Sequence, residues 1–304
     1  MAKEYYAHGK LLLTGEYAVL DGALALALPT KKGQKMTVKN TRGSDLIWES
    51  FTPEGNSWFN ADFAILDFKS NKTTNLETSL LLMKIFKGAI NLNSEFLSKW
   101  NGFKVETQLE FPQNWGLGSS STLIHLVAQW ADVNPLELYY KVFSGSGFDV
   151  ACAGADGPIT FFSNDEEIGY TSINWTPSFT KNIYFVHLNE KADSQIAVKD
   201  YFKKARKRKQ LAADIDAITK EMVNVSSLSK FEELIDKHES ILSKSLGLPT
   251  IKEERFSDFQ GCVKSLGAWG GDFALVTGSK ENDLREYFTE KGHDTVLSYS
   301  DLIL

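Results

Sequence analysis

A glycine-serine stretch that runs directly into an amphipathic helix constrains this chain most. It spans residues 111–131, FPQNWGLGSSSTLIHLVAQWA. Gly116 and Gly118 lack a Cβ, so the backbone there can adopt positive φ and come close to a ligand. The serines that follow can cap the helix, and the first N–H groups of a helix attract anions. The stretch predicts a phosphate-binding loop, although the same residues also suit a simple turn and helix cap.

Two commoner phosphate-binding patterns do not fit this loop. A P-loop would continue with Gly-Lys-Ser or Gly-Lys-Thr, and no such residues follow. A dinucleotide-binding fingerprint would need a third glycine, which is missing here. The loop must therefore be judged together with the other motifs of the chain.

Length and composition describe a globular protein. The chain has 304 residues, 42% of them hydrophobic, which is enough for two domains. The net charge of −6 argues against a general nucleic-acid binder, and two cysteines cannot form a disulfide framework or a four-ligand zinc site. No apolar run approaches the roughly 20 residues of a membrane span. We expect a soluble, cytoplasmic protein that binds neither nucleic acid nor a membrane.

Hydrophobic periodicity predicts a β-rich first part and a second part with more helices. Polar and turn-forming residues between 162 and 180 separate the two, so we predict domains at 1–170 and 171–304. The predicted strands are 10–14, 17–20, 23–28, 34–40, 45–50, 57–62, 103–110 and 182–188. The predicted helices are 76–90, the helix after the glycine-serine loop, 135–142, 194–208, 211–225, 230–246 and 252–265.

Two further glycine clusters accompany chemistry-bearing residues. Asp149 follows the turn at residues 144–147 after a single residue, Phe148, and a carboxylate beside a phosphate is the usual base for a hydroxyl that attacks. The same residue could simply stabilise a helix N-terminus. The third cluster, at residues 264–278, could bring backbone close to a ligand or merely end a helix.

Three motifs, taken in their order along the chain, resemble those of the GHMP kinases, the superfamily of galacto-, homoserine, mevalonate and phosphomevalonate kinases. The first motif corresponds to AHGKLLLTGEYAVLDG at 7–22, the second to PQNWGLGSSS at 112–121 and the third to SLGAWGGD at 265–272. The resemblance spans nearly the whole chain. It implies a two-domain GHMP kinase fold of the α+β class, with a ribosomal-protein-S5-like N-terminal domain and a ferredoxin-like C-terminal domain.

Within the superfamily, the motifs are similar to those of phosphomevalonate kinase and of a bacterial branch named for a Gly-Tyr-Asp-Ile-Ala (GYDIA) motif. Mevalonate kinases usually have a histidine where Tyr17 stands and a glycine where Asp272 stands. Two residues depart from the family pattern. His8 replaces the usual proline, and Trp269 interrupts the third glycine run.

The resemblance implies ATP-dependent phosphoryl transfer to a small-molecule acceptor, with ATP and Mg²⁺ as cofactors. Asp149 would orient or deprotonate the acceptor, and Lys10 would neutralise charge near the transferred phosphoryl group. Ser120 would help to hold Mg²⁺, and Glu137 is the nearest candidate for a carboxylate ligand, although it equally suits a first-turn helix acid. The implied ATP-binding residues are Pro112, Gly116, Leu117, Gly118, Ser119, Ser120 and Ser121, and the implied substrate-binding residues are Glu16, Tyr17, Gly147, Gly270 and Gly271.

The motifs favour phosphomevalonate, of the isoprenoid precursor pathway, as the acceptor. Mevalonate kinase, the related diphosphomevalonate decarboxylase and a non-catalytic member that binds a ligand or partner protein are the alternatives, and a homodimer is left open. A phosphorylated acceptor beside ATP requires further cations, for which Lys31, Lys32, Lys69, Lys72 and Lys264 are candidates. The basic run at 203–209 fits a solvated helix face.

Overall fold

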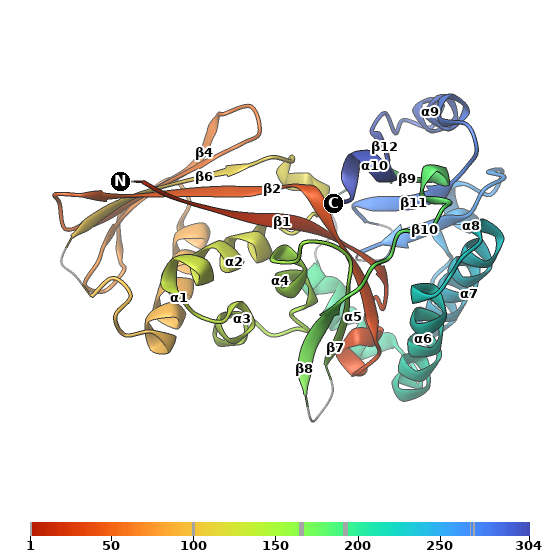
Figure 1. Cartoon of the computed structure of the whole chain (residues 1–304), viewed down its shortest axis with the longest axis horizontal. Coiled ribbons are helices and arrows are strands. Elements are labelled where there is room, and N and C mark those ends of the chain that lie inside the picture. Colours follow the sequence, from red (N-terminus) through yellow and green to blue (C-terminus); the bar gives the residue numbers. More distant parts are fainter. Residues whose placement is uncertain (1, 99–100, 164–166, 191–193, 268, 270) are drawn as a thin grey trace. The chain divides into compact units, whose positions relative to one another are not determined.

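The computed structural model describes residues 2–98, 101–163, 167–190, 194–267, 269 and 271–304, which form two compact units (Figure 1). Unit 1 comprises Met1–Gly9, Lys32–Gln113 and Leu117–Gly154. Unit 2 comprises Lys10–Lys31, Asn114–Gly116 and Ala155–Leu304. The chain thus passes between the units several times, and two long strands, β1 (Lys3–Thr14) and β2 (Ala25–Thr41), contribute residues to both. The domain boundary at residue 170 remains a prediction.

Unit 1 is built on a twisted sheet in which hydrophobic residues alternate with polar ones. In β3, Leu46 and Trp48 are buried while their neighbours are more exposed, because successive side chains point to opposite faces. The strand order in this unit is β5-β4-β3-β6-β2, with β3 and β6 parallel and the other pairs antiparallel. The remaining strands are β3 (Asp45–Phe51), β4 (Ser57–Ala64), β5 (Ser70–Thr73) and β6 (Gly102–Leu109).

Four helices complete unit 1, and in Figure 1 α1, α2 and α3 lie together on one side of its strands. The ring of Phe86 in α1 packs against Trp48 of the sheet, with centroids 5.7 Å apart. Asn134 caps α3 as predicted, because its side chain accepts from the N–H groups of Leu136 and Glu137. The helices are α1 (Leu76–Leu92), α2 (Ser119–Ala131), α3 (Pro135–Val142) and α4 (Phe148–Ala153).

Unit 2 contains an antiparallel sheet in the order β10-β11-β9-β12. It also contains a hairpin of β7 and β8, in which β7 pairs on its other side with residues 25–27 of β2. Every residue of β9, β10 and β11 is buried. The strands are β7 (Ile159–Ser163), β8 (Ile168–Ser172), β9 (Ile183–His187), β10 (Val263–Leu266), β11 (Phe273–Thr277) and β12 (Val296–Ser298).

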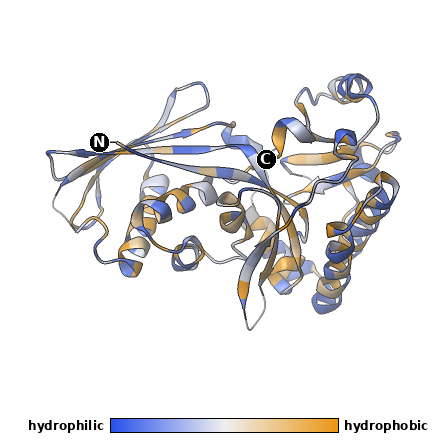
Figure 2. Ribbon diagram, in the orientation of Figure 1, coloured by the Kyte–Doolittle hydropathy of each residue, from blue (hydrophilic) through white to orange (hydrophobic). Residues whose placement is uncertain are grey.

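The helices of unit 2 include a long pair, α6 and α7, of which α7 also contacts β10. Figure 2 shows that both carry hydrophobic and hydrophilic residues, as expected for helices that cover a core on one face. None of the described helices has the length and apolar character needed to cross a bilayer. The helices are α5 (Ser194–Lys204), α6 (Arg208–Val223), α7 (Leu228–Leu246), α8 (Ile251–Arg255), α9 (Glu281–Glu290) and α10 (Tyr299–Leu302).

The α+β class is confirmed, but several predicted elements were wrong. Residues 17–20 are not a strand: the short 3₁₀ helix η1 (Ala18–Asp21) follows a turn in which Gly15 and Tyr17 have φ of 103° and 57°. The strands predicted at 23–28 and 34–40 are parts of the single strand β2. The helix predicted at 252–265 ends at Arg255, and its last three residues belong to a buried strand, β10, which begins at Val263.

Each unit holds one of the two cysteines. Cys152 is buried in α4 of unit 1, and Cys262 is buried just before β10 of unit 2. Burial, together with the nearby charge of Asp236, raises the pKa of the Cys262 thiol well above its ordinary value. Both side chains therefore belong to packed interiors.

Candidate active site

The predicted phosphate loop ends at the N-terminus of α2 in unit 1. Gly118 is the N-cap, with φ 91° and ψ 44°, and it provides no capping side chain. The hydroxyls of Ser121 and Thr122 instead donate back to the carbonyl oxygens of Gly118 and Ser119, at 2.7 and 2.9 Å. The serines therefore do not cap the helix as predicted. The N-cap therefore leaves the first N–H groups of α2 without a capping side chain, an arrangement that can accept an anion.

The preceding residues, 114–116, are held in unit 2 by side chains from the sheet. Gly116 has φ 64°, and a Cβ there would lie 2.0 Å from the carboxylate of Asp272. The ring of Trp115 packs edge-on against Phe273, with centroids 5.6 Å apart. His187 Nε2 lies 3.2 Å from the carbonyl oxygen of Asn114. Only glycine therefore fits at position 116.

Lys10 joins the first motif to this loop. Its Nζ donates to the carbonyl oxygen of Gly116 at 3.1 Å, and both residues belong to unit 2. The contact places the lysine's positive charge at the glycine loop. A cation there would attract the negative charge of a bound phosphate.

Glu16 and Tyr17 of the first motif lie against the third motif, also within unit 2. The carboxylate of Glu16 is 3% exposed and pairs with the ammonium of Lys264. The Tyr17 ring stacks on Tyr201, and its hydroxyl accepts from the N–H of Trp269 at 3.1 Å. Burial raises the pKa of Tyr17 to about 12, so this hydroxyl stays protonated at neutral pH. Glu16 faces Lys264 rather than an accessible surface, so its role in binding substrate remains a prediction.

Asp149 occupies the first turn of α4 in unit 1. Its helix is capped by Gly147, whose φ of 83° is accessible mainly to glycine. Two tyrosines of α3 surround this turn: Tyr140 donates to the carbonyl of Ser146, and Tyr139 lies beside Gly145. Burial first, and the charge of Asp149 second, raise the pKa of both tyrosines. Both tyrosines therefore stay neutral near Asp149, whose Oδ1 accepts from the N–H of Val150 at 3.1 Å.

The remaining predicted residues lie as follows. Ser120 is exposed in the first turn of α2, Glu137 is exposed in the first turn of α3, and the two helices contact each other. Within the described part of the chain, no group of three or more His, Cys, Asp or Glu side chains could hold a metal ion. Pro112 is half-buried, and Leu117 and Gly271 are buried. Gly270 lies outside the described residues.

Sequence reasoning missed several residues that shape these motifs. From the sequence, Asp272 was noted only because mevalonate kinases usually have a glycine at this position, although its side chain occupies the space beside Gly116. His187 carried no sequence signal, because its partner Asn114 is 73 positions away. Tyr139 and Tyr140 are adjacent aromatics in a short amphipathic helix, a pattern that indicates packing rather than a site.

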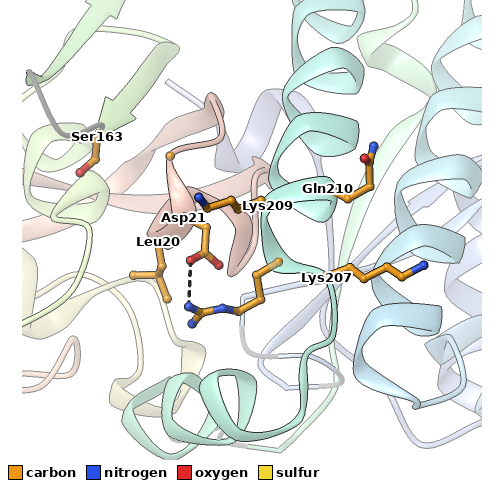
Figure 3. Close-up of a pocket in the computed structure, with 8 residues that line it drawn as sticks. Leu20, Asp21, Ser163, Lys207, Lys209 and Gln210 are labelled. Atoms are coloured by element: carbon orange, nitrogen blue, oxygen red, sulfur yellow. Dashed lines mark ion pairs between the residues drawn. The ribbon is translucent and has the colours of Figure 1, made fainter.

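A cavity of about 1030 Å³ lies in unit 2 beside the end of the first motif (Figure 3). Asp21 pairs with Arg208 at 3.7 Å and accepts from the hydroxyl of Tyr201 at 2.5 Å. In Figure 3, the side chain of Lys209 extends toward the segment that carries Asp21, whereas Lys207 points away. The cavity is lined by Leu20, Asp21, Gly22, Ser163, Lys207, Arg208, Lys209 and Gln210. The phosphate loop is not among its lining residues.

No model of a protein family matches this sequence, and a comparison with curated proteins finds no match. Comparison with solved structures does find likenesses over the whole chain. A *Methanococcus jannaschii* mevalonate kinase superimposes with a TM-score of 0.72 at 19% identity, covering 98% of this chain and 96% of that one. A *Streptococcus pneumoniae* phosphomevalonate kinase in complex with phosphomevalonate and AMPPNP gives 0.74 at 15% identity, with 98% and 99% covered.

A galactokinase of *Lactococcus lactis* complexed with galactose superimposes similarly, with a TM-score of 0.72 at 13% identity and 98% and 92% covered. At identities this low, the structural likeness shows the fold but does not show the substrate. The three proteins act on different small molecules but share one α+β architecture with this chain. The chain has the fold of the GHMP kinases.

Proposed function

We propose that this protein is an ATP-dependent kinase that phosphorylates a small-molecule alcohol. The observation that carries the proposal is the hydrogen bond from Lys10 to the carbonyl of Gly116. It brings a cation to a glycine loop that leads into an uncapped helix N-terminus, and these are the groups that a nucleotide triphosphate requires. The shared fold supports the same chemistry.

In this reaction an oxygen of the acceptor attacks the γ-phosphorus of ATP: a phosphate oxygen of phosphomevalonate, or a hydroxyl oxygen of mevalonate. A new P–O bond forms, the bond from the γ-phosphorus to the bridging oxygen breaks, and ADP leaves. Asp149 orients the attacking oxygen and takes its proton where it carries one, while the backbone N–H groups of Ser119 to Ser121 bind the phosphates. Lys10 stabilises the negative charge on the transferred group.

Ser120 and Glu137 would hold Mg²⁺, which neutralises part of the triphosphate charge. Both are exposed, and both stand on helices that contact each other. Mg²⁺ commonly binds through one or two protein oxygens together with substrate phosphates and water. Two oxygen-bearing side chains are therefore a sufficient protein contribution.

For the acceptor, we propose phosphomevalonate ahead of mevalonate. A phosphorylated acceptor needs a cation, and most of the lysines considered from the sequence already have partners: Lys31 donates to Ser300 O, Lys32 to Glu110 O, and Lys69 pairs with Asp67. The ammonium of Lys264 is fully buried. The cavity beside the first motif is lined by Lys209 and by Arg208, of which Arg208 pairs with Asp21. Lys209 is therefore the better candidate for binding the acceptor's own phosphate.

The test is a coupled ADP-release assay with mevalonate, phosphomevalonate, homoserine and galactose as acceptors. We expect turnover with phosphomevalonate, with kcat/KM at least ten-fold above that for mevalonate. A ten-fold preference for mevalonate would make it a mevalonate kinase, and CO₂ release from diphosphomevalonate would identify a decarboxylase. ATP binding without turnover on any of these acceptors would support the non-catalytic alternative.

The phosphate-binding role of the cavity has its own variant. Lys209→Ala should raise KM for phosphomevalonate about ten-fold and leave KM for mevalonate unchanged, because only the first acceptor carries a phosphate. Lys220→Ala is the matched control, since Lys220 is an exposed lysine on the same helix, paired with Asp216. Equal effects on both acceptors would exclude Lys209 from phosphate recognition.

A further inference from the structure

Lys264 is a buried lysine at the centre of a charge cluster within unit 2. Its side chain is 0% exposed, in a strand whose four residues are all buried. Its Nζ lies 2.5 Å from Glu16 Oε1, 3.4 Å from Glu239 Oε1 and 2.9 Å from the carbonyl oxygen of Ser265. An ammonium has three N–H donors, so all of them have acceptors inside the protein. Lys264 therefore has no donor left for a ligand.

The cluster connects three elements that are far apart in the sequence. Glu16 comes from the turn after β1, Glu239 and His238 from α7, and Lys264 from β10. His238 Nε2 lies 3.1 Å from Glu16 Oε2 and 3.3 Å from the backbone N of Gly15. The N–H of Ser265 donates to Glu239 Oε2 at 3.1 Å. The same few groups thus fix both the first-motif turn and the start of the third motif.

The charges of the cluster are strongly coupled. Burial lowers the pKa of Lys264, but the charges of Glu16 and Glu239 outweigh it and hold that pKa above its ordinary value. Burial likewise raises the pKa of Glu16, but Lys264 and His238 outweigh it and hold that pKa below its ordinary value. Both groups remain charged at neutral pH.

Stability alone is a poor reason for such a cluster. Removing two charges from water is costly, and well-packed apolar residues of similar volume often stabilise a protein as much or more. An ion pair with directional hydrogen bonds, however, specifies one geometry where apolar packing tolerates several. The geometry fixed here is unusual, since the turn holds Tyr17, which has a Cβ, at a positive φ of 57°, two residues after Gly15 at φ 103°. Such positions persist only where their surroundings over-determine them.

We propose that Lys264 is a positioning residue, which acts through Glu16 to hold the Gly15–Tyr17 turn in the conformation that the acceptor requires. This turn also positions Tyr17, whose hydroxyl accepts a hydrogen bond from the backbone N–H of Trp269 in the third motif. The proposal rests on the proposed function for its catalytic consequence. Its structural part, the anchoring of the turn, can be measured without any turnover.

The test compares three variants. Lys264→Met leaves two buried carboxylates unpaired, so it should lower Tm and can fail to fold. The triple variant Lys264→Met/Glu16→Gln/Glu239→Gln removes all of these charges together and should recover most of the lost Tm. Glu233→Gln is the matched control, because Glu233 is an exposed glutamate on the same helix, α7, and pairs with Lys230 outside the cluster.

Two measurements decide the outcome in the folded triple variant. Amide hydrogen exchange of residues 14–20 should become at least ten-fold faster, and kcat/KM for the acceptor should fall at least ten-fold while KM for ATP stays within two-fold. Glu233→Gln should stay near the wild type in both. Unchanged exchange in the triple variant would overturn the proposal, as would recovery of kcat/KM together with Tm. Faster exchange in a protein whose wild type phosphorylates no acceptor would overturn the proposed function and leave the anchoring role standing.

Discussion

The ammonium of Lys10 donates a hydrogen bond to the carbonyl oxygen of Gly116 at 3.1 Å, across 106 positions of sequence. Asp272 approaches the same glycine from the third motif, so closely that a Cβ on Gly116 would lie 2.0 Å from its carboxylate. Residues from all three glycine-containing motifs therefore meet at Gly116 within unit 2. This convergence gives each motif a measurable dependence on the others.

Replacement of Lys10 tests the charge at this point. Lys10→Ala should lower kcat about 10²-fold, because it removes a cation that stabilises the transferred phosphoryl group. The free energy of unfolding should change by only about 1 kcal/mol, the usual net value of one hydrogen bond. Steady-state kinetics and urea unfolding measure the two quantities. Wild-type kcat in a folded Lys10→Ala protein would remove Lys10 from the mechanism.

Replacement of Asp149 tests the proton acceptor. Asp149→Asn keeps the shape of the side chain but removes its basicity, so kcat should fall about 10²-fold or more while ATP affinity and Tm stay nearly unchanged. Calorimetric titration with a non-hydrolysable ATP analogue provides the affinity. Turnover at the wild-type rate would show that another group accepts the proton.

Replacement of Gly116 tests the close packing of the loop. Gly116→Ala should destabilise the protein by about 1–3 kcal/mol and weaken nucleotide binding, because the new Cβ meets the Asp272 carboxylate at a positive φ. Gly55→Ala is the matched control: Gly55 has φ 83°, but nothing lies within 4 Å of its added Cβ. If both variants lose the same stability and both bind nucleotide normally, the contact with Asp272 has no special importance.

The buried cluster predicts a pH dependence of stability with two limits. Glu16 has a pKa below its ordinary value of 4.5 in the folded state, so its contribution is present above pH 4.5 and is lost as the pH falls through the lowered pKa. Lys264 has a pKa above its ordinary value of 10.5, so its contribution is present below pH 10.5 and is lost as the pH rises through the raised pKa. Urea unfolding of the wild type and the triple variant across this range should show that the free energy of unfolding changes less with pH in the variant, at both the acid and the alkaline end. Identical pH profiles would mean that the cluster does not titrate with folding.

A structural feature can be predicted from the sequence when the residues that determine it lie close together along the chain. The bounds of α3 were predicted because Asn134 and Pro135 are local start signals, and the N-cap hydrogen bonds confirm them. The strand β10 was assigned to a helix, since a short buried apolar run has no periodicity that separates strand from helix. The η1 turn was missed because Tyr17 gives no sequence indication of a positive φ.

The site shows the same limit. The glycine loop and Asp149 stand out locally, because glycine patterns and an adjacent acid can be recognised within ten residues. The burial of Lys264 cannot be recognised in this way, since lysine is usually exposed and its partner Glu16 is 248 positions away. Contacts of this length are set by tertiary packing, which no window of sequence contains.

The two buried cysteines allow the opening of each unit to be measured by thiol labelling, because each unit contains one of them. Cys152 is buried in unit 1 and Cys262 in unit 2, so a thiol reagent reaches each sulfur only when the surrounding unit opens. Labelling rates at the two sulfurs, resolved by mass spectrometry, thus follow the opening of each unit separately in the unmodified protein. Added nucleotide or acceptor would slow the labelling of whichever unit it stabilises, which assigns each ligand to a unit without any engineered probe.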